Sequence, residues 1–405
     1  MKVPENATPA ARRLPFIDAL RGFALFGVFG ANLMTFSGFD YLTEAQKASA
    51  MITGYDRIAH ALYLFLVESK FIGLFSILFG ISFWLFLDRA RARGGPATLL
   101  FYRRIGWLFL FGALHGWLLW CFDILRFYAL WAILLPLFVR MPLRRLLAVA
   151  LSMAVLGPAV IAGVRVLLEG SDDPRYAYDA LWLAIFSTGD YFEVLAANWK
   201  LDWLWRNSLG ELAYQLAIFG RLLLGLYVAR ALNLANLDGH RALLEKILVI
   251  GAIVGAAGNL VSASHFLADA EGFVLPFLRR LIVNCGFLGF TLAYASGLAL
   301  LFLNLRWKAA VLVLAPIGQM ALTWYLLQTV FGIWLFYGFV PGGPHLMGKV
   351  GPAWLTLIWV VGFAVQIGLA HAWMRRFRFG PAEWLWRTLT YWQVQPLKSG
   401  TRTAG

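Results

Sequence analysis

The sequence predicts an all-α membrane protein, a polytopic bundle of about ten transmembrane helices with both termini in the cytoplasm. The chain is 61% hydrophobic and 14% charged over 405 residues, whereas soluble domains are about 45–50% apolar and about 25% charged. A soluble fold of this size keeps a large water-exposed surface, so it could not hide this much apolar side chain. We therefore expect a multi-pass protein whose main partner is the lipid bilayer.

Ten apolar runs approach the length of a spanning helix, which needs about 20 residues. They are residues 16–37, 58–88, 105–122, 124–139, 146–168, 211–231, 246–268, 281–304, 310–338 and 353–374. The second and ninth are too long for one straight crossing, so we expect breaks near residues 68–70 and 316–318. The first run has no small-residue cleavage site behind it and predicts an uncleaved span.

The placement of charge predicts the topology. The net charge of +14 would suggest a nucleic-acid partner in a soluble protein. Here, however, 23 of the 35 lysines and arginines cluster in alternate segments between the apolar runs, which is typical of cytoplasmic loops. The longest opposite loop, residues 169–210, is acidic. We expect this loop outside, both termini inside, and no nucleic-acid partner.

We divide the chain into an N-terminal transmembrane half (1–168), an outer loop (169–210), a C-terminal transmembrane half (211–392) and a flexible tail (393–405). The outer loop is rich in tryptophan and contains Trp182, Trp199, Trp203 and Trp205. These aromatic residues suit an interfacial helix at headgroup level. A sugar-binding surface is the alternative, and the sequence leaves both open.

Polar side chains deep in a span are costly and usually functional. His115 lies near the middle of the third span, between Gly112 and Gly116, whose helix face allows another backbone to approach closely. A neutral imidazole can act as a general base without bringing a net charge into the membrane. Asn32, Tyr325 and Gln328 lie at similar depth and are further catalytic candidates, with helix–helix hydrogen bonding as the structural alternative for the two amides.

Asp123 is a further candidate, eight residues after His115. In a continuous helix this spacing places it about 12 Å and 80° away from His115. We therefore expect Asp123 not to orient His115 directly, and to cap the turn into the fourth span or to belong to the site by another contact.

The predicted inner face is basic. Asp18 and Arg21 are three residues apart on one helix and form a natural pair, and Arg13, Arg103 and Arg104 are expected at the same level. Such a ring could hold the phosphates of a nucleotide-like donor. Ordinary positive-inside anchoring is the alternative.

Glu68, Lys70 and Arg221 form a second predicted polar set at the membrane midplane. It could bind a transported solute, or Lys70 and Arg221 could simply neutralise Glu68. The chain contains no Walker loop, dinucleotide fingerprint or zinc helix motif, and its two cysteines lack metal-ligand spacing. We predict no metal site.

Several stretches resemble the bacterial YeiB-type proteins, the family of domain of unknown function 418. They are RLPFIDALRGFALFGVFGANL (13–33), KFIGLFSILFGISF (70–83), RRIGWLFLFGALHGWLLWCFDILRFYAL (103–130), PIGQMALTWYLLQTVFGIWLFYG (316–338) and GPAEWLWRTLTYW (380–392). The resemblance covers nearly the whole chain outside the 169–210 loop. Gln319 and Trp324 depart from the arginine and asparagine usual in the family, which puts a polar site in that helix in doubt.

The family's first spans are similar to those of membrane acyltransferases, including the lysosomal heparan glucosaminide acetyltransferase. The resemblance implies a bacterial inner-membrane enzyme with an acyltransferase-like N-terminal half, a cytoplasmic donor such as acetyl-CoA or another acyl-CoA, and an envelope glycan or lipid acceptor. His115 would then be a general base or transient acyl carrier. A transporter or permease using Glu68, Lys70 and Arg221 is the alternative function, and a homodimer stays open.

Overall fold

The computed structural model describes residues 14–94, 96–170, 178–264 and 271–398. Within these ranges the chain is helical and forms no strand. Eight helical segments are long and apolar enough to cross a membrane. Their helices are α1 (Pro15–Phe36), α3 (Gly54–Leu66) with α4 (Lys70–Ala92), α5 (Ala97–Leu118), α8 (Leu143–Leu151) with α9 (Gly157–Glu169), α12 (Leu209–Ala231), α13 (Arg241–Ala263), α14 (Val274–Leu303) and α18 (Pro352–Met374). This confirms the predicted all-α polytopic bundle.

The other two predicted spans are interrupted helices. Residues 124–139 form α6 (Leu125–Ala132) and the short α7 (Leu135–Phe138). Residues 310–338 are divided among α15 (Leu305–Leu312), α16 (Ala315–Gln319) and α17 (Ala321–Phe336), so the predicted break near 316–318 is present. Both α7 and α16 carry a proline in their first turn. Proline has no backbone N–H and its ring clashes with the preceding turn, so the helix before it ends and a new helix begins.

The predicted break near residues 68–70 is also present. The chain leaves α3 at Leu66, and Ser69 adopts a left-handed conformation with φ of 64° before α4 begins. A non-glycine residue rarely adopts this conformation, so it marks a sharp local change of direction. The carbonyl groups freed at the end of α3 are partly satisfied by Lys70, whose Nζ donates to the Leu64 carbonyl at 2.6 Å.

Small residues bring the spanning helices into close contact. A Cβ added at Gly22 of α1 would lie 2.2 Å from the Leu314 carbonyl oxygen, and one added at Gly318 of α16 would lie 1.8 Å from the Asp18 carbonyl oxygen. Gly80 of α4 and Gly225 of α12 meet in the same way. Such backbone approaches are typical of helix packing in membranes. They join α1 to α16 and α4 to α12, so helices from the first half of the chain pack on helices of the second half.

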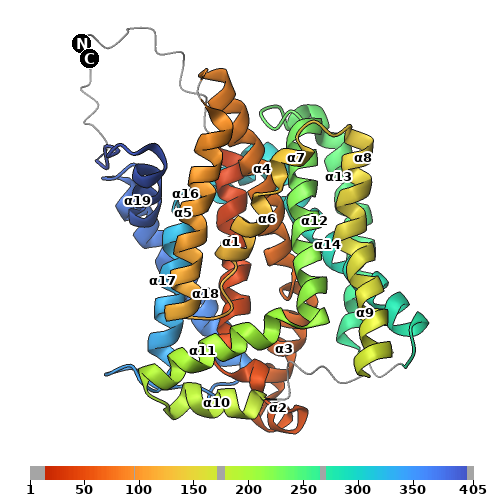
Figure 1. Ribbon diagram of the computed structural model, residues 1–405, viewed down its shortest axis with the longest axis vertical. Coiled ribbons are helices and arrows are strands. Elements are labelled where there is room, and N and C mark those ends of the chain that lie inside the picture. Colours follow the sequence, from red (N-terminus) through yellow and green to blue (C-terminus); the bar gives the residue numbers. More distant parts are fainter. Residues whose placement is uncertain (1–13, 95, 171–177, 265–270, 399–405) are drawn as a thin grey trace.

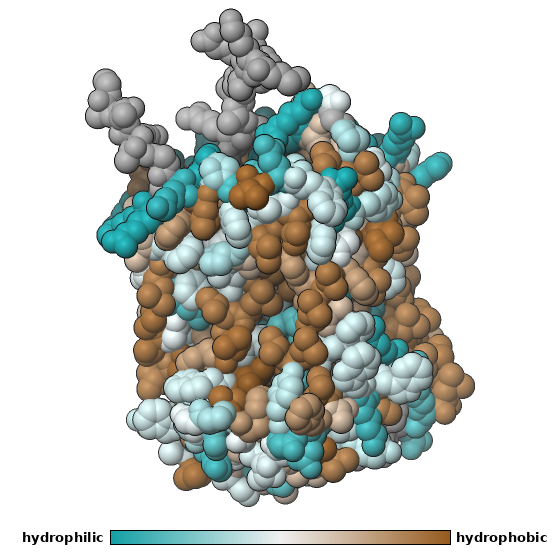
Figure 2. Space-filling view, turned by 60° about the vertical axis from the view of Figure 1, so that its left-hand side comes forward, coloured by the Kyte–Doolittle hydropathy of each residue, from teal (hydrophilic) through white to brown (hydrophobic). Residues whose placement is uncertain are grey.

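The outer surface of the bundle matches a membrane environment. Figure 2 shows hydrophobic side chains gathered over its middle, with hydrophilic side chains concentrated towards its two ends. Large apolar residues on α13 and α18 are exposed there, including Ile253 and Val361. Exposed apolar side chains of this kind are unfavourable in water and favourable in contact with lipid chains.

Two further helices, α10 (Asp179–Thr188) and α11 (Tyr191–Arg206), form the outer-loop region. They lie across one end of the bundle, opposite α19 (Pro381–Tyr391) (Figure 1). Trp182 is buried, whereas Trp199 and Trp203 are 51% and 70% exposed. Trp205 is partly buried. The two exposed tryptophans are therefore the best placed to meet lipid headgroups or a sugar. The remaining short elements are η1 (Phe39–Tyr41), α2 (Glu44–Ala50), η2 (Ser152–Leu156) and η4 (Asp238–His240).

Candidate active site

His115 and Asp123 are in direct contact. The Nδ1 atom of His115 lies 2.7 Å from Oδ2 of Asp123, and both side chains are buried. This corrects the expectation that Asp123 could not orient His115. The expectation assumed a continuous helix, but α5 ends at Leu118, where the His115 carbonyl accepts backbone hydrogen bonds from Leu119 and Trp120. The chain then folds back, and Asp123 returns to the imidazole.

Two glycines of α5 make room for this turn. A Cβ at Gly112 would lie 2.3 Å from the Arg126 backbone nitrogen and 2.7 Å from Oδ1 of Asp123. A Cβ at Gly116 would lie 3.2 Å from the Asp123 Cβ. The expected close approach of another backbone to this helix face is therefore present, and the approaching backbone is the turn that carries Asp123.

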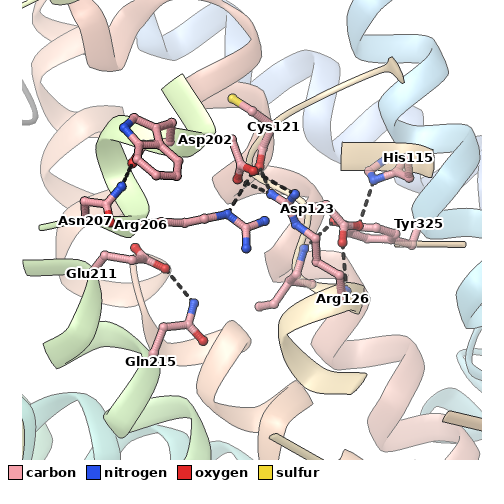
Figure 3. Close-up of polar contacts among 12 residues, drawn as sticks. His115, Cys121, Asp123, Arg126, Asp202, Arg206, Asn207, Glu211, Gln215 and Tyr325 are labelled. Atoms are coloured by element: carbon pink, nitrogen blue, oxygen red, sulfur yellow. Dashed lines mark hydrogen bonds and ion pairs between the residues drawn. The ribbon is translucent and has the colours of Figure 1, made fainter. Parts of the chain in front are cut away.

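Asp123 accepts hydrogen bonds on both carboxylate oxygens. The Arg126 backbone N–H donates to Oδ1 at 2.9 Å, and the Tyr325 hydroxyl lies 3.5 Å from Oδ2. The same hydroxyl accepts from the Ile124 backbone N–H at 3.2 Å. Figure 3 shows the carboxylate between His115 and Arg126, with Tyr325 beside it. Tyr325 is thus part of the cluster that the sequence predicted around His115.

The contact with Asp123 favours one tautomer of the imidazole. A carboxylate in its ionised form only accepts hydrogen bonds, so opposite such a carboxylate Nδ1 of His115 is the nitrogen that carries the hydrogen and donates the hydrogen bond. In this tautomer the Nε2 atom has a free lone pair. It lies 3.0 Å from Oγ1 of Thr329, whose hydroxyl also lies 3.4 Å from the Tyr325 carbonyl oxygen. Thr329 was not predicted. Its position four residues after Tyr325 places both on one face of α17, which is the one sequence signal that could have found it.

A buried ion pair with α11 supports the turn that carries Asp123. The Arg126 guanidinium contacts both carboxylate oxygens of Asp202 in α11 and also donates to the Cys121 carbonyl at 2.8 Å. Arg206 forms a second ion pair with Asp202 at 2.8 Å. The outer loop is therefore attached to the site through Arg126 (Figure 3). Nothing local in the sequence signals this pair, because Arg126 and Asp202 are 76 residues apart.

The position of α17 is fixed from the opposite end of the bundle. Glu383 of α19 accepts from the backbone N–H groups of Leu322 and Thr323 at 2.6 and 3.1 Å, and from the Thr323 hydroxyl at 2.6 Å. Burial raises the pKa of Glu383, and these hydrogen bonds oppose that rise. A carboxylate at a helix N-terminus satisfies amides that have no partner within the helix. The GPAEW stretch thus caps the helix that carries Tyr325 and Thr329.

Two other predicted catalytic residues do not contact His115. Gln328 is buried, and its amide donates to the Gln366 side chain of α18 at 2.9 Å. This is the hydrogen bond between helices that the sequence offered as the structural alternative to a catalytic role. Asn32 is partly buried on α1, and in the described part of the chain its side chain makes no hydrogen bond.

The predicted inner ring is partly assembled. Arg21 donates to Asp18 at 2.9 Å, as expected, and also to the Gly318 carbonyl and to the Ser82 hydroxyl. These contacts join α1, α16 and α4, so Arg21 has a structural role. Arg13 lies outside the described residues.

Arg103 and Arg104 contact α19. Arg103 donates to the Thr390 carbonyl at 3.3 Å, and the Arg104 guanidinium lies 3.6 Å from the centroid of the Trp386 ring. The charges of Arg21 and Arg387 both act on Arg104. Arg387 was not predicted, although it lies in the GPAEWLWR stretch. The end of the bundle that carries α19 thus has a cationic cluster at the junction of α1, α5 and α19.

The predicted midplane set does not form one cluster. Lys70 is fully buried against the Phe287 ring, and Glu68 acts electrostatically on it. Arg221 is also buried, but among the described residues it forms no ion pair with Glu68. The simple neutralisation of Arg221 by Glu68 is therefore not observed.

Known proteins similar to this chain share nearly its whole length. The profile of the family described as protein of unknown function DUF418 matches residues 228–393, which include Tyr325, Thr329 and Glu383. The uncharacterized protein YxaH of Bacillus subtilis is 30% identical over 407 residues, covering 96% of this chain and 97% of the relative. The uncharacterized protein YeiB of Escherichia coli is 29% identical, covering 95% and 98%. An uncharacterized 39.9 kDa protein of Bacillus acidopullulyticus is 26% identical, covering 95% and 96%.

Proposed function

This chain belongs to the DUF418 family of YeiB-type proteins, and we propose that it is an inner-membrane acyltransferase. It moves an acyl group, most simply acetyl, from a cytoplasmic acyl-CoA to a hydroxyl or amine of an envelope glycan or lipid. The observation that carries the proposal is the buried chain of contacts from Asp123 through His115 to Thr329. It resembles the acid–histidine–hydroxyl arrangement that many acyl-transfer enzymes use.

The geometry suits general-base catalysis at Nε2. Asp123 keeps the proton on Nδ1 and stabilises the imidazolium that forms during reaction. In the proposed step, the acceptor hydroxyl replaces Thr329 at Nε2, gives its proton to that nitrogen and attacks the thioester carbonyl carbon. A C–O bond forms and the C–S bond breaks. The imidazolium then returns the proton to the departing sulfur, so the products are an acyl ester and free CoA.

The inner cationic cluster suits the phosphates of the donor. Arg104 lies eleven residues before His115 on α5, which corresponds to about 16 Å along the helix axis. A donor held by Arg103, Arg104 and Arg387 would therefore have to extend its thioester along α5 towards His115. The long, thin pantetheine arm of CoA has this form. Tyr325, which lies beside Asp123 and His115, is the candidate for orienting the carbonyl or the acceptor. Asn32 and Gln328 do not contact His115.

The test is turnover by a His115→Gln variant in proteoliposomes supplied with acetyl-CoA and envelope extract. Glutamine has similar size and keeps one hydrogen bond, but it cannot accept the proton. We expect release of free CoA thiol to fall by about 10²–10⁴-fold, with yield and thermal stability near wild type. His371→Gln is the matched control, because His371 lies in a spanning helix and its ring bonds only a backbone carbonyl. Wild-type turnover by His115→Gln would reject the mechanism.

A permease is the second candidate. The broken helix at Ser69 and the buried, unpaired Arg221 favour it, because interrupted helices and intramembrane charges form the substrate sites of many transporters. Solute uptake by proteoliposomes without any release of CoA thiol from acetyl-CoA would favour this function over acyl transfer.

A further inference from the structure

Arg221 is a buried cation with no counter-charge among the residues that the structure describes. It lies twelve residues after the first residue of α12, about 18 Å along that helix, and it is only 3% exposed. Its Nε has no hydrogen-bond partner, and within the described ranges its side chain forms neither a hydrogen bond nor an ion pair. A charge inside a membrane protein is strongly unfavourable unless a partner compensates it. The position therefore calls for an anion.

The packing around Arg221 does not supply that anion. On one side, a Cβ at Gly73 of α4 would lie 3.4 Å from the Arg221 Nε and 3.0 Å from Oγ1 of Thr291 in α14. The Thr291 hydroxyl is already engaged with the carbonyls of Lys70 and Phe287. Gly73 and Thr291 thus leave space for the guanidinium, but neither carries a charge.

The other groups around Arg221 are tyrosine hydroxyls. Tyr128 of α6 and Tyr214 of α12 are the titratable residues that act electrostatically on the guanidinium. Tyr214 lies seven residues before Arg221, on the same face of α12, and in the described part of the chain its hydroxyl has no hydrogen-bond partner. The Tyr128 hydroxyl shares a hydrogen bond with Ser76 at 2.9 Å and donates to the Ile72 carbonyl at 3.2 Å. Tyr214 is therefore the tyrosine whose hydroxyl is free to donate to an anion beside Arg221.

We propose that Arg221, together with the hydroxyl of Tyr214, forms a binding site for an oxyanion, that is, a carboxylate or phosphate group. The planar guanidinium offers two parallel N–H donors that match the spacing of oxygens in these groups. The Tyr214 hydroxyl can donate to one of the remaining lone pairs. Lys70 is not part of the site, because its ammonium donates to the Leu64 carbonyl. The inference goes beyond acyl transfer, since it requires neither His115 nor an acyl donor.

The test is the thermal stability of the purified full-length protein in sodium phosphate, sodium acetate or sodium chloride at equal ionic strength. A ligand that binds only the folded state raises the unfolding temperature with its concentration. Phosphate also stabilises many proteins nonspecifically, so only the part that depends on Arg221 counts. The variants are Arg221→Met and the conservative Arg221→Lys. Arg230→Gln is the matched control on the same helix, because Arg230 already donates to the Met141 carbonyl.

We expect phosphate or acetate, but not chloride, to raise the unfolding temperature of the wild type and of Arg230→Gln with saturation. Arg221→Met should unfold at a higher temperature than wild type in chloride, because an unpaired charge is gone, and should lose the oxyanion response. Arg221→Lys should retain only part of it. A larger rise of the unfolding temperature in phosphate than in acetate identifies the bound group as a phosphate, and the reverse identifies it as a carboxylate. An equal response in wild type and Arg221→Met, or no response in wild type, would overturn the proposal.

Discussion

At the scale of single residues, Asp123 organises the candidate site. One of its oxygens holds the backbone of its own turn through Arg126, and the other holds the His115 imidazole at 2.7 Å. The carboxylate therefore fixes both the tautomer and the orientation of the ring. In a buried site this hydrogen bond is stronger than in water, and leaving either partner unpaired is correspondingly costly.

Asp123→Asn tests this role directly. Asparagine keeps the size of the side chain but removes the charge that stabilises a protonated imidazole, and its amide can favour the wrong tautomer. We expect release of CoA thiol from acetyl-CoA to fall by about 10²–10⁴-fold, a loss comparable to that of His115→Gln. The measurement is turnover in proteoliposomes, with unfolding temperature recorded in parallel. Asp238→Asn is the control, since Asp238 forms an exposed pair with Arg241. An Asp123→Asn variant as fast as wild type would show that the carboxylate has no part in catalysis.

The sequence predicted some residues of this site and not others, for physical reasons. His115 and Tyr325 were identifiable because polar side chains stand out in apolar spans. The contact between His115 and Asp123 was not, because it depends on the end of α5 at Leu118. The pair formed by Arg126 and Asp202 depends on how the outer loop packs, which no local pattern encodes.

At the scale of helices, close packing and interruption determine where the polar groups meet. The glycines of α5 admit the turn after it, and the break before α17 creates a helix N-terminus inside the bundle, which Glu383 caps. The stretches that resemble the family thus have separate structural roles. Residues 14–33 of the first stretch pack α1 on α16, and residues 103–130 form the turn that brings Asp123 to His115. Residues 380–392 hold α17 through Glu383.

Gly112→Ala tests the packing of the α5 turn. The added Cβ would lie 2.3 Å from the Arg126 backbone nitrogen, so the turn must move and carry Asp123 away from His115. We expect a loss of about 1–3 kcal/mol of stability from overpacking, together with reduced turnover. The measurements are unfolding temperature and CoA thiol release.

Gly106→Ala is the matched control for this prediction. It lies in the same helix, and a Cβ there meets nothing within 4 Å. Alanine favours helix over glycine by about 1 kcal/mol, so this variant should be at least as stable as wild type. If both variants behave alike, the close approach at Gly112 does not position the site.

At the scale of the whole molecule, the long apolar runs predicted most of the helical architecture. Long apolar runs identified the spans because a bilayer requires continuous hydrogen-bonded helix. Two of the interruptions, near residues 68–70 and 316–318, were also visible, since polar residues stand at the first and a proline at the second. The break between α6 and α7 was not predicted. The course of the outer-loop helices was not, because α10 and α11 are short and their positions follow from contacts such as Asp202 with Arg126.

The orientation of the bundle in the membrane is the last prediction. The end that carries α19 holds Arg103, Arg104 and Arg387, while the opposite end is covered by α10 and α11 (Figure 1). Basic residues are retained on the cytoplasmic side. We therefore expect α11 outside and the end of α4 inside.

Single cysteines at two exposed alanines distinguish the two orientations, in a Cys285→Ser background with the buried Cys121 retained. Ala196 lies on α11, and Ala92 is the last residue of α4. In intact spheroplasts a membrane-impermeant thiol reagent should label Ala196→Cys and not Ala92→Cys, whereas lysed membranes should label both. Labelling of Ala92→Cys alone in spheroplasts would invert the topology. The cationic cluster would then face away from cytoplasmic CoA, and the proposed route of the acyl group along α5 would be impossible.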